Sequence, residues 1–160
     1  VFQHSALLGS LTVAENVTLR LREHRTHSAV ETEAICNQAL RQVEMLGSRD
    51  KLPSELSGGM QKRVAIARAL AAFPELVLYD EPTAELDPVL TEQMAALIRS
   101  IQREQGITQL LVSHNLGLAY EVADRIALLG HGRIDEIGTP ELIRKSTNEG
   151  TRQFVKAAEF

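Results

Sequence analysis

Two neighbouring stretches constrain this sequence more than any other part of it: Leu56 to Gln61, which reads LSGGMQ, and Leu76 to Pro82, which reads LVLYDEP. In the first, Ser57 is a suitable N-cap, and the glycines after it open a long helix. The free N–H groups and positive dipole end of such a helix favour an anion such as phosphate. In the second, a short apolar strand carries Asp80 and Glu81 to its carboxyl end, where the ligand crevices of open α/β sheets lie. The pair therefore predicts a contact to phosphate together with carboxylates that can hold Mg²⁺ and activate water.

The apolar spacing of the rest of the chain predicts alternating helices and strands. The residues from Thr12 and from Ser28 each have the form of a capping box, so each should begin a helix, the first running to about Arg22 and the second to Gly47. The further expected elements are helices at 87–106, 116–123, 139–144 and 152–160, a strand at 108–112, and a hairpin of strands at 124–129 and 134–137.

Composition excludes several classes of protein. With 160 residues, 44% hydrophobic and 24% charged, the chain has the make-up of an ordinary globular domain. Its net charge of −4 argues against a general nucleic-acid binder. The lone Cys36 offers neither a disulfide nor a metal cluster, which favours a reducing compartment. Since no apolar run is long enough to cross a bilayer, a role at a membrane would need a partner subunit.

The start of the chain predicts that residues are missing ahead of it. Val1 is not an initiator methionine, and Val1 to Gln3 reads like the end of a buried strand. A phosphate-binding P-loop needs the pattern G-x-x-x-x-G-K-[ST], and no lysine of this sequence follows a glycine. We therefore expect this chain to be the carboxyl-terminal part of a longer one, with any P-loop upstream of residue 1.

Between the two stretches lies a helix that carries Arg63 and Arg68, and its apolar stripe leaves Lys62 and Arg63 on or near the exposed side. Taken in this order, the motifs resemble the ATP-binding subunits of ABC transporters, with LSGGMQ similar to their signature motif and LVLYDE to their Walker B strand. The resemblance implies an α/β fold, namely an incomplete P-loop NTPase (RecA-like) ABC ATPase core with an α-helical subdomain. It divides the chain into residues 1–74 (Q-loop, helical subdomain and signature helix), 75–138 (core portion) and 139–160 (carboxyl-terminal helices).

Three further motifs follow the pattern of that family. Gln3 resembles the glutamine of the Q-loop, Asp87 the aspartate of the D-loop, and His114 the switch histidine of the H-loop. The D-loop departs from the commoner form, since Ala84-Glu85 stands where the family has Ser-Gly or Ala-Gly, and this leaves the role of Glu85 open.

The resemblance also implies the roles of these residues, with ATP and Mg²⁺ as cofactors. Asp80 would bind Mg²⁺, because a hard cation prefers oxygen ligands, and Glu81 would act as general base on the attacking water. His114 would contact the γ-phosphate, and Gln3 would meet both the metal and the water. The implied catalytic residues are thus Glu81, His114 and Gln3, and the implied metal ligands are Asp80 and Gln3.

Residues of the signature motif imply a dimer. In this family the motif contacts ATP held by a second copy of the subunit, so the active unit is a head-to-tail homodimer with two composite sites. The implied nucleotide contacts of this chain are Ser57, Gly58, Gly59, Gln61 and Asp87. These 160 residues alone, without a P-loop, are expected to be inactive.

A membrane permease is the second implied partner. The segment from Ser5 to Glu23 corresponds to the region that touches the coupling helix of the permease, and Leu7, Leu8 and Leu11 make its loop more apolar than a free loop requires. The alternative is an amphipathic packing helix, and both can hold. The resemblance places the protein peripherally on the cytoplasmic face of the bacterial inner membrane, with no nucleic-acid partner.

Flanking segments suggest a substrate. The stretches FQHSALLGSLTVAENV, LREH, PSELSGGM and RQF resemble the ATPase of the Mla/toluene-tolerance family, which serves phospholipid traffic with an MlaE-type permease and an MCE-domain protein. The alternatives are the ATPase of an importer or exporter of another solute, a non-transport ABC ATPase of translation or DNA repair, and an interaction fragment without catalysis.

Overall fold

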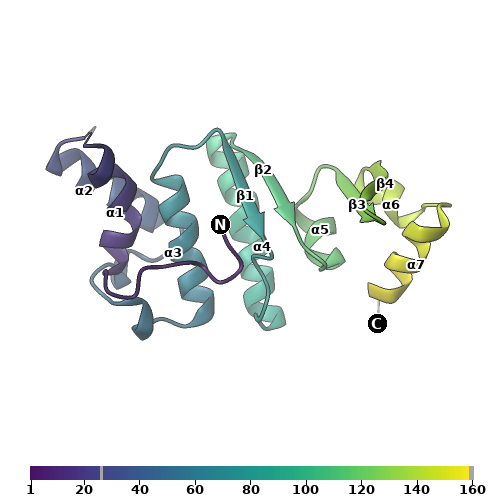
Figure 1. Ribbon diagram of the computed structural model, residues 1–160, viewed down its shortest axis with the longest axis horizontal. Helices are drawn as coiled ribbons and strands as arrows, with labels where there is room; N and C mark the ends of the chain where they lie inside the picture. Colours follow the sequence, from purple (N-terminus) through teal and green to yellow (C-terminus); the bar gives the residue numbers. More distant parts are fainter. Residues whose placement is uncertain (26, 159–160) are drawn as a thin grey trace. The chain divides into compact units, whose positions relative to one another are not determined.

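The computed structural model describes residues 1–25 and 27–158 (Figure 1). It divides into two compact units, Val1–Val112 and Ser113–Phe160, and each is described by itself. The motifs predict boundaries at residues 74 and 138, which do not coincide with these two units. That division separates functional parts of the chain, not compact units, and it stays a prediction.

Three helices of the first unit pack as a bundle: α1 (Val13–His24), α2 (Ala29–Gln42) and α3 (Gly58–Leu70). Both expected capping boxes are confirmed. The expected end of α2 at Gly47 is wrong, because Glu44 takes a left-handed φ of 60° that stops the helix early. Two 3₁₀ turns, Leu46–Ser48 and Pro53–Glu55, lead on to α3. The side chains that close the core, each at most 1% exposed, are Val13, Val17, Cys36, Leu40, Val43, Val64 and Ile66.

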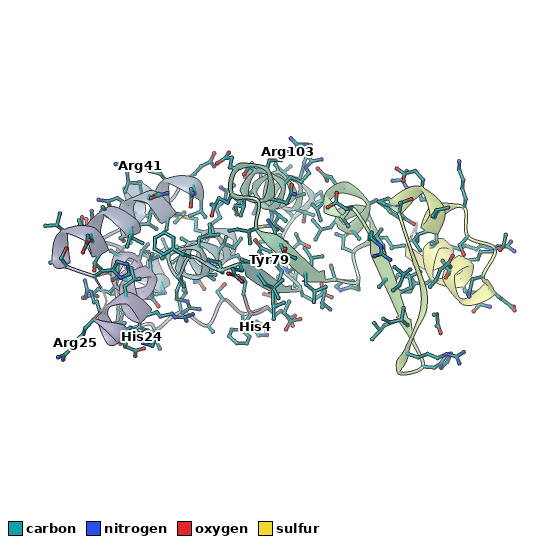
Figure 2. The ribbon with its side chains drawn as sticks, turned by 90° about the horizontal axis from the view of Figure 1, so that it is seen from above. His4, His24, Arg25, Arg41, Tyr79 and Arg103 are labelled. Carbon is teal, nitrogen blue, oxygen red and sulfur yellow. The ribbon has the colours of Figure 1, made fainter. Side chains whose placement is uncertain are left out.

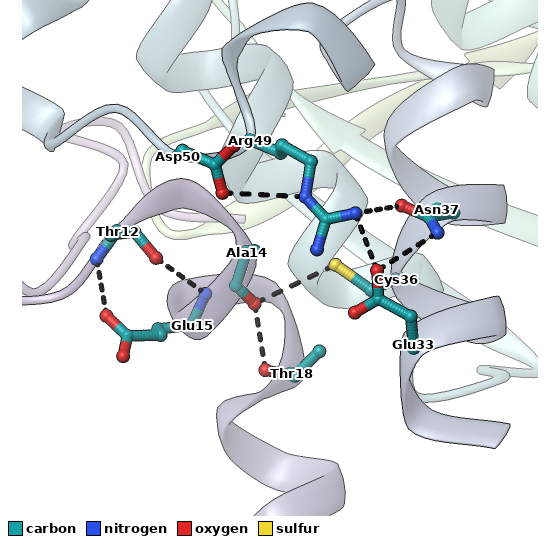
Figure 3. Close-up of polar contacts among 9 residues, drawn as sticks. All are labelled: Thr12, Ala14, Glu15, Thr18, Glu33, Cys36, Asn37, Arg49 and Asp50. Atoms are coloured by element: carbon teal, nitrogen blue, oxygen red, sulfur yellow. Dashed lines mark hydrogen bonds and ion pairs between the residues drawn. The ribbon is translucent and has the colours of Figure 1, made fainter. Parts of the chain in front are cut away.

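Polar contacts at the edge of this bundle tie α2 to the loop before α3 (Figure 3). Nη1 of Arg49 donates to Oε1 of Glu33 at 2.6 Å and to Oδ1 of Asn37 at 2.9 Å. The thiol of Cys36 is buried against the carbonyl of Ala14, at 3.8 Å, and burial raises its pKa. A thiol in such a place is a packing group of the bundle.

The parallel sheet of the first unit consists of β1 (Leu76–Asp80) and β2 (Thr108–Val112), joined through α4 (Pro88–Gln105). Helix α4 covers one face of the strands, and Nε2 of Gln109 donates to the carbonyl of Ile98 on that helix at 3.1 Å. Tyr79 lies inside this layer, whereas the labelled Arg103 points outward (Figure 2). The opposite face carries apolar side chains that are 50 to 58% exposed, namely Leu76, Leu78, Leu110 and Val112.

Val1 continues this sheet on the other edge of β1. Its amino group donates to the carbonyl of Leu78 at 2.6 Å, and the N–H of Asp80 donates to the carbonyl of Val1 at 3.0 Å. These two bonds have the pattern of a parallel pair, in agreement with the expectation that Val1 to Gln3 reads like a strand end. Gln3 is thereby brought to the acidic end of β1.

Helix α3 corrects the expectation that Lys62 and Arg63 lie on or near an exposed side. Lys62 is only 6% exposed, and the side chain of Arg63 is 15% exposed. The reason is that α3 packs on two sides: Arg63 donates to the carbonyl of Val43 at the end of α2, while Lys62 reaches the loop that follows Val1.

The second unit consists of α5 (Leu116–Val122), the antiparallel hairpin β3 (Ile126–Gly130) and β4 (Arg133–Gly138), and helices α6 (Pro140–Arg144) and α7 (Glu149–Ala158). The expected hairpin is confirmed, and its two turn residues have positive φ, as a tight hairpin turn requires. The terminal helix begins at Glu149, ahead of the expected Arg152, and Phe160 lies outside the described residues.

Hydroxyl groups hold α7 and the loop that follows α6 to β4. The carboxylate of Glu136 accepts hydrogen bonds from Ser146 Oγ at 2.5 Å and from Thr151 Oγ1 at 2.6 Å, and these bonds lower its pKa. In the part of the chain that the structure describes, no helix is both long and apolar enough to cross a membrane.

Candidate functional site

The start of α3 is the first part of the candidate site. Ser57 has an extended backbone, and its Oγ accepts a hydrogen bond from the N–H of Met60 at 3.3 Å, which confirms the expected N-cap. A Cβ on Gly58 would meet nothing within 4 Å, so the main chain is open to a ligand there. A Cβ on Gly59 would lie 3.6 Å from Leu90 and 3.7 Å from Leu86, so this residue faces the beginning of α4. The geometry leaves first-turn N–H groups that suit a phosphate oxygen.

Gln61 is already engaged within the chain. Its Nε2 donates to the carbonyl of Pro53 at 3.0 Å and more weakly to that of Leu56 at 3.4 Å. The side chain therefore fixes the turn that precedes α3, and its expected contact with nucleotide stays a prediction.

The acidic end of β1 is the second part. Asp80 is the last residue of the strand and is exposed, and Glu81 follows it in a left-handed conformation with φ of 44°. Such a φ is rare for a residue other than glycine and is retained only where the surroundings enforce it. Here the N–H of Glu81 donates to the carbonyl of Val112 at 2.9 Å, and its carbonyl accepts from Ala84 at 3.1 Å. The fold thus holds the Glu81 backbone in one orientation beside Asp80.

The turn after Glu81 contains Glu85, the residue at which the sequence departs from the resembling family. Glu85, which stands where the resembling family has glycine, has a φ of 64°. Glycine adopts this conformation without steric cost, whereas glutamate does not. Asp87 next accepts the N–H of Leu90 at 2.9 Å and confirms the expected N-cap, with Pro88 at the first helical position. Its expected role across a dimer interface stays a prediction.

Gln3 is held from α3. Nζ of Lys62 donates to the carbonyl of Gln3 at 2.9 Å, and Arg68 donates to the carbonyls of Ser5 and Ala6 at 2.8 and 2.7 Å. The sequence contains a signal against the expected exposure of Lys62. Ala65 and Ile66 follow Lys62 by one helical turn, which indicates a second buried face of the helix.

Asn16 is a further residue that sequence reasoning missed. It is fully buried on α1. Its amide accepts from the N–H of Leu8 and donates to the carbonyls of Leu8, Leu11 and Thr12. A fully satisfied amide of this kind holds the loop ahead of α1 in a single shape. A polar residue between Val13 and Val17, on the buried stripe of an amphipathic helix, is the signal that marks it.

His114 belongs to the second unit and is described there by itself. Its side chain is exposed, and the neighbouring Ser113 accepts a hydrogen bond from the N–H of Asn115 at 3.1 Å. The first unit therefore brings together Gln3, Lys62 and the acidic end of β1, while the expected role of His114 stays a prediction.

The donor set at the end of β1 fits Mg²⁺. Asp80 and Glu81 offer hard carboxylate oxygens, and Mg²⁺ in phosphate sites takes one or two carboxylates and fills its remaining positions with phosphate and water. Among residues 1–25 and 27–158 no group of three or more His, Cys, Asp or Glu side chains could hold a metal by itself. A protein-only metal cage is thus not what this site offers.

Comparison with known proteins identifies the family. The model of the ABC transporter family matches residues 1–84, which include the LSGGMQ and LVLYDEP stretches. The chain belongs to the ABC transporter family.

The curated relatives are ATP-binding proteins of importers and of an amino-acid transporter. The chain is 39% identical over 158 residues to the methionine import ATP-binding protein of Haemophilus ducreyi, covering 98% of this chain and 46% of that one. It is 40% identical over 158 residues to a probable amino-acid ABC transporter ATP-binding protein of Sinorhizobium fredii, covering 98% and 59%. It is 40% identical over 140 residues to the sulfate/thiosulfate import ATP-binding protein of Synechococcus elongatus, covering 88% and 40%. The chain spans about half the length of the curated relatives it matches.

A solved structure supports the fold. An ATP-binding cassette, determined as a dimer in a post-hydrolysis state with ADP and phosphate, matches 88% of this chain and 61% of its own with a TM-score of 0.76 and 34% identity. The expected fold class, an incomplete α/β ABC ATPase core, is confirmed.

Proposed function

We propose that this chain is part of the ATP-hydrolysing subunit of an ABC importer of a small solute. The observation that carries the proposal is the combination, within one compact unit, of the Ser57-capped helix start and the Asp80-Glu81 pair at the end of a parallel strand. Hydrolysis also requires a P-loop, whose Gly-Lys pair these 160 residues lack, so the proposal applies to a longer chain that carries one.

Each residue of the candidate site has its own role in the proposed hydrolysis of ATP. Glu81, whose backbone is held by Val112, accepts a proton from the attacking water. Ser57 and the N–H groups of Gly58 and Gly59 bind phosphate oxygens of ATP held by a second copy. Asp80, with help from Gln3, would hold Mg²⁺, and the ion would neutralise phosphate charge when it is bound. The exposed His114 binds the γ-phosphate.

The importer reading replaces phospholipid transport as our main hypothesis. The relatives named above serve import of methionine or of sulfate and thiosulfate, or transport of amino acids, and none of them is a phospholipid transporter. The predicted MlaE-type permease and MCE-domain partners therefore have no support from these relatives. Uptake of labelled amino acids or sulfate, compared with phospholipid exchange, would distinguish the two substrate classes.

A membrane permease is the proposed partner, and residues 5–23 are its proposed docking segment. Leu8 is 46% exposed on this segment, and its main chain is held by Asn16 through hydrogen bonds of 2.8 and 3.1 Å. A rigid loop that shows an apolar side chain suits a docking surface. Binding there would keep the subunit on the cytoplasmic face of the inner membrane.

The test is Glu81→Gln in the longer chain that carries a P-loop. Loss of the general base should lower ATP turnover by roughly 10²- to 10⁴-fold and trap an ATP-bound dimer. Phosphate release would measure ATP turnover, and light scattering would measure dimerisation. Glu92→Gln, at an exposed position of α4, is the matched control and should leave both unchanged. Unaltered turnover in Glu81→Gln would contradict the assigned base, and a monomer with ATP bound would contradict the dimer.

A further inference from the structure

Lys62 is an unusual residue for its position. It is 6% exposed, and within the part of the chain that the structure describes it is the only buried charged side chain. Burying an ammonium group is unfavourable unless it is hydrogen-bonded or faces opposite charge. Packing alone would be served better by an apolar side chain, so the charge of Lys62 calls for another explanation.

Its surroundings connect three parts of the candidate site. Nζ donates to the main-chain carbonyl of Gln3 at 2.9 Å. Burial lowers the pKa of the Lys62 ammonium, and the negative charges of Glu85 and Glu81 act in the opposite direction. One ammonium group on α3 thus holds the loop of Gln3, and the start of that loop is tied to the acidic end of β1 because the N–H of Asp80 donates to the carbonyl of Val1.

The loop of Gln3 needs such a contact. Val1 pairs with β1, but the chain then leaves the sheet, and Ser5 and Ala6 both adopt left-handed φ values of 59° and 46°. Residues other than glycine keep this conformation only where neighbours enforce it. Arg68 holds the carbonyls of Ser5 and Ala6, and Lys62 holds that of Gln3. Both cationic side chains come from α3, and each donates hydrogen bonds to main-chain carbonyls in a different part of the loop.

We propose that Lys62 is a positioning residue for hydrolysis: by holding the carbonyl of Gln3 close to the acidic turn, it sets the direction in which the Gln3 side chain meets the metal and the water. The inference rests on the proposed function. Helix α3 begins with the proposed phosphate-binding turn, and through Lys62 it also holds Gln3, a proposed residue of the hydrolytic site.

Kinetics in the longer, P-loop-containing chain test the proposal. Lys62→Met should lower kcat on the order of tenfold to a hundredfold, because misplacement of a catalytic group has this effect, while KM for ATP changes by no more than about twofold. Lys62→Arg keeps a cation with donors and should retain most of the activity. Lys145→Met, at an exposed lysine of the second unit, is the matched control and should behave like the parent.

A double-mutant cycle with Gln3→Ala separates positioning from structural support. If Lys62 acts through Gln3, adding Lys62→Met to Gln3→Ala should lower kcat little further. If instead the two effects multiply, or if Lys62→Arg is as damaged as Lys62→Met, Lys62 has only a structural role and the proposal is overturned.

A measurement without turnover keeps this inference distinct from the proposed function. In the 160-residue chain, Lys62→Met should speed amide hydrogen exchange at Ser5 and Ala6, whose N–H groups bond within the loop, and Lys145→Met should not. Unchanged exchange overturns the claim that Lys62 holds the loop. Faster exchange in the 160-residue chain, together with a longer, P-loop-containing chain that fails to hydrolyse ATP, would support the hold of Lys62 on the loop and would contradict the proposed ATPase.

Discussion

The helical bundle and the β1–β2 sheet of the first unit differ in how completely they are covered. In the bundle, Leu40 and Val64 have no exposed surface, whereas Leu78 and Leu110 on the open face of the sheet are 54% and 57% exposed. Each helix buries apolar side chains against the other two, so three helices suffice to close a core. A strand presents side chains to both faces, and α4 covers only one of them.

The open face of the β1–β2 sheet, unlike the bundle, depends on further layers of protein for its burial. Contiguous apolar side chains on one side of a parallel sheet are normally buried by a second layer. The bundle should therefore tolerate isolation, and the open sheet face should contribute little to stability in these 160 residues.

Leu40→Ala is expected to have the largest effect. Removing a fully buried leucine should lower the free energy of unfolding by about 2 to 5 kcal/mol, because it leaves a cavity in the bundle. The matched change on the open face, Leu78→Ala, should cost less than about 0.5 kcal/mol, as surface substitutions do. Urea unfolding followed by circular dichroism measures both. Equal losses would break the comparison, since they would mean that the sheet face is covered as well as the bundle.

Ser57→Ala should have an intermediate effect. It removes the side-chain acceptor of the Met60 N–H and should lower the free energy of unfolding by about 1 kcal/mol. Amide exchange at Met60, measured together with urea unfolding, would localise the loss to the start of α3. The control is Ser54→Ala, at an exposed position of the preceding 3₁₀ turn. If the control lost as much stability, capping would not be the cause.

Tyr79→Phe should have the smallest effect, and of opposite sign. The Tyr79 hydroxyl lies on the covered face of β1 without a hydrogen-bond partner among the described residues, and burial raises its pKa. Removing an unsatisfied buried hydroxyl should leave stability unchanged or raise it by up to about 1 kcal/mol, since a buried polar group without a partner is unfavourable. Thermal and urea unfolding of the variant would show this. A clear loss of stability would mean that the hydroxyl has a partner, and the covered face would then be as well satisfied as the bundle.

Much of the fold could be predicted because its signals are local. The caps at Thr12, Ser28, Ser57 and Asp87 were all confirmed. The early end of α2 could not be predicted, since it depends on the left-handed φ of Glu44, a residue with no turn preference of its own. The burial of Lys62 was missed because periodicity was counted on one face of α3 only.

For the candidate site, the motifs identified the ABC transporter family, and the family match supports that identification. The flanking resemblance to phospholipid transporters has no comparable support, because flanking segments carry no chemistry that requires a given substrate. The role of Glu81 is a prediction that Glu81→Gln tests, and the roles of His114 and Asp87 stay predictions.

The sequence by itself determined where the helices with a side-chain cap begin, since a cap and the N–H group that it binds lie three residues apart, as Ser57 and Met60 do. It also determined which strand carries the carboxylates. Only the tertiary structure decided that Lys62 is buried, that it holds Gln3, and that Val112 holds Glu81. Lys62 and Gln3 are 59 positions apart, and no local pattern specifies a contact that depends on how α3, β1 and the first loop pack together.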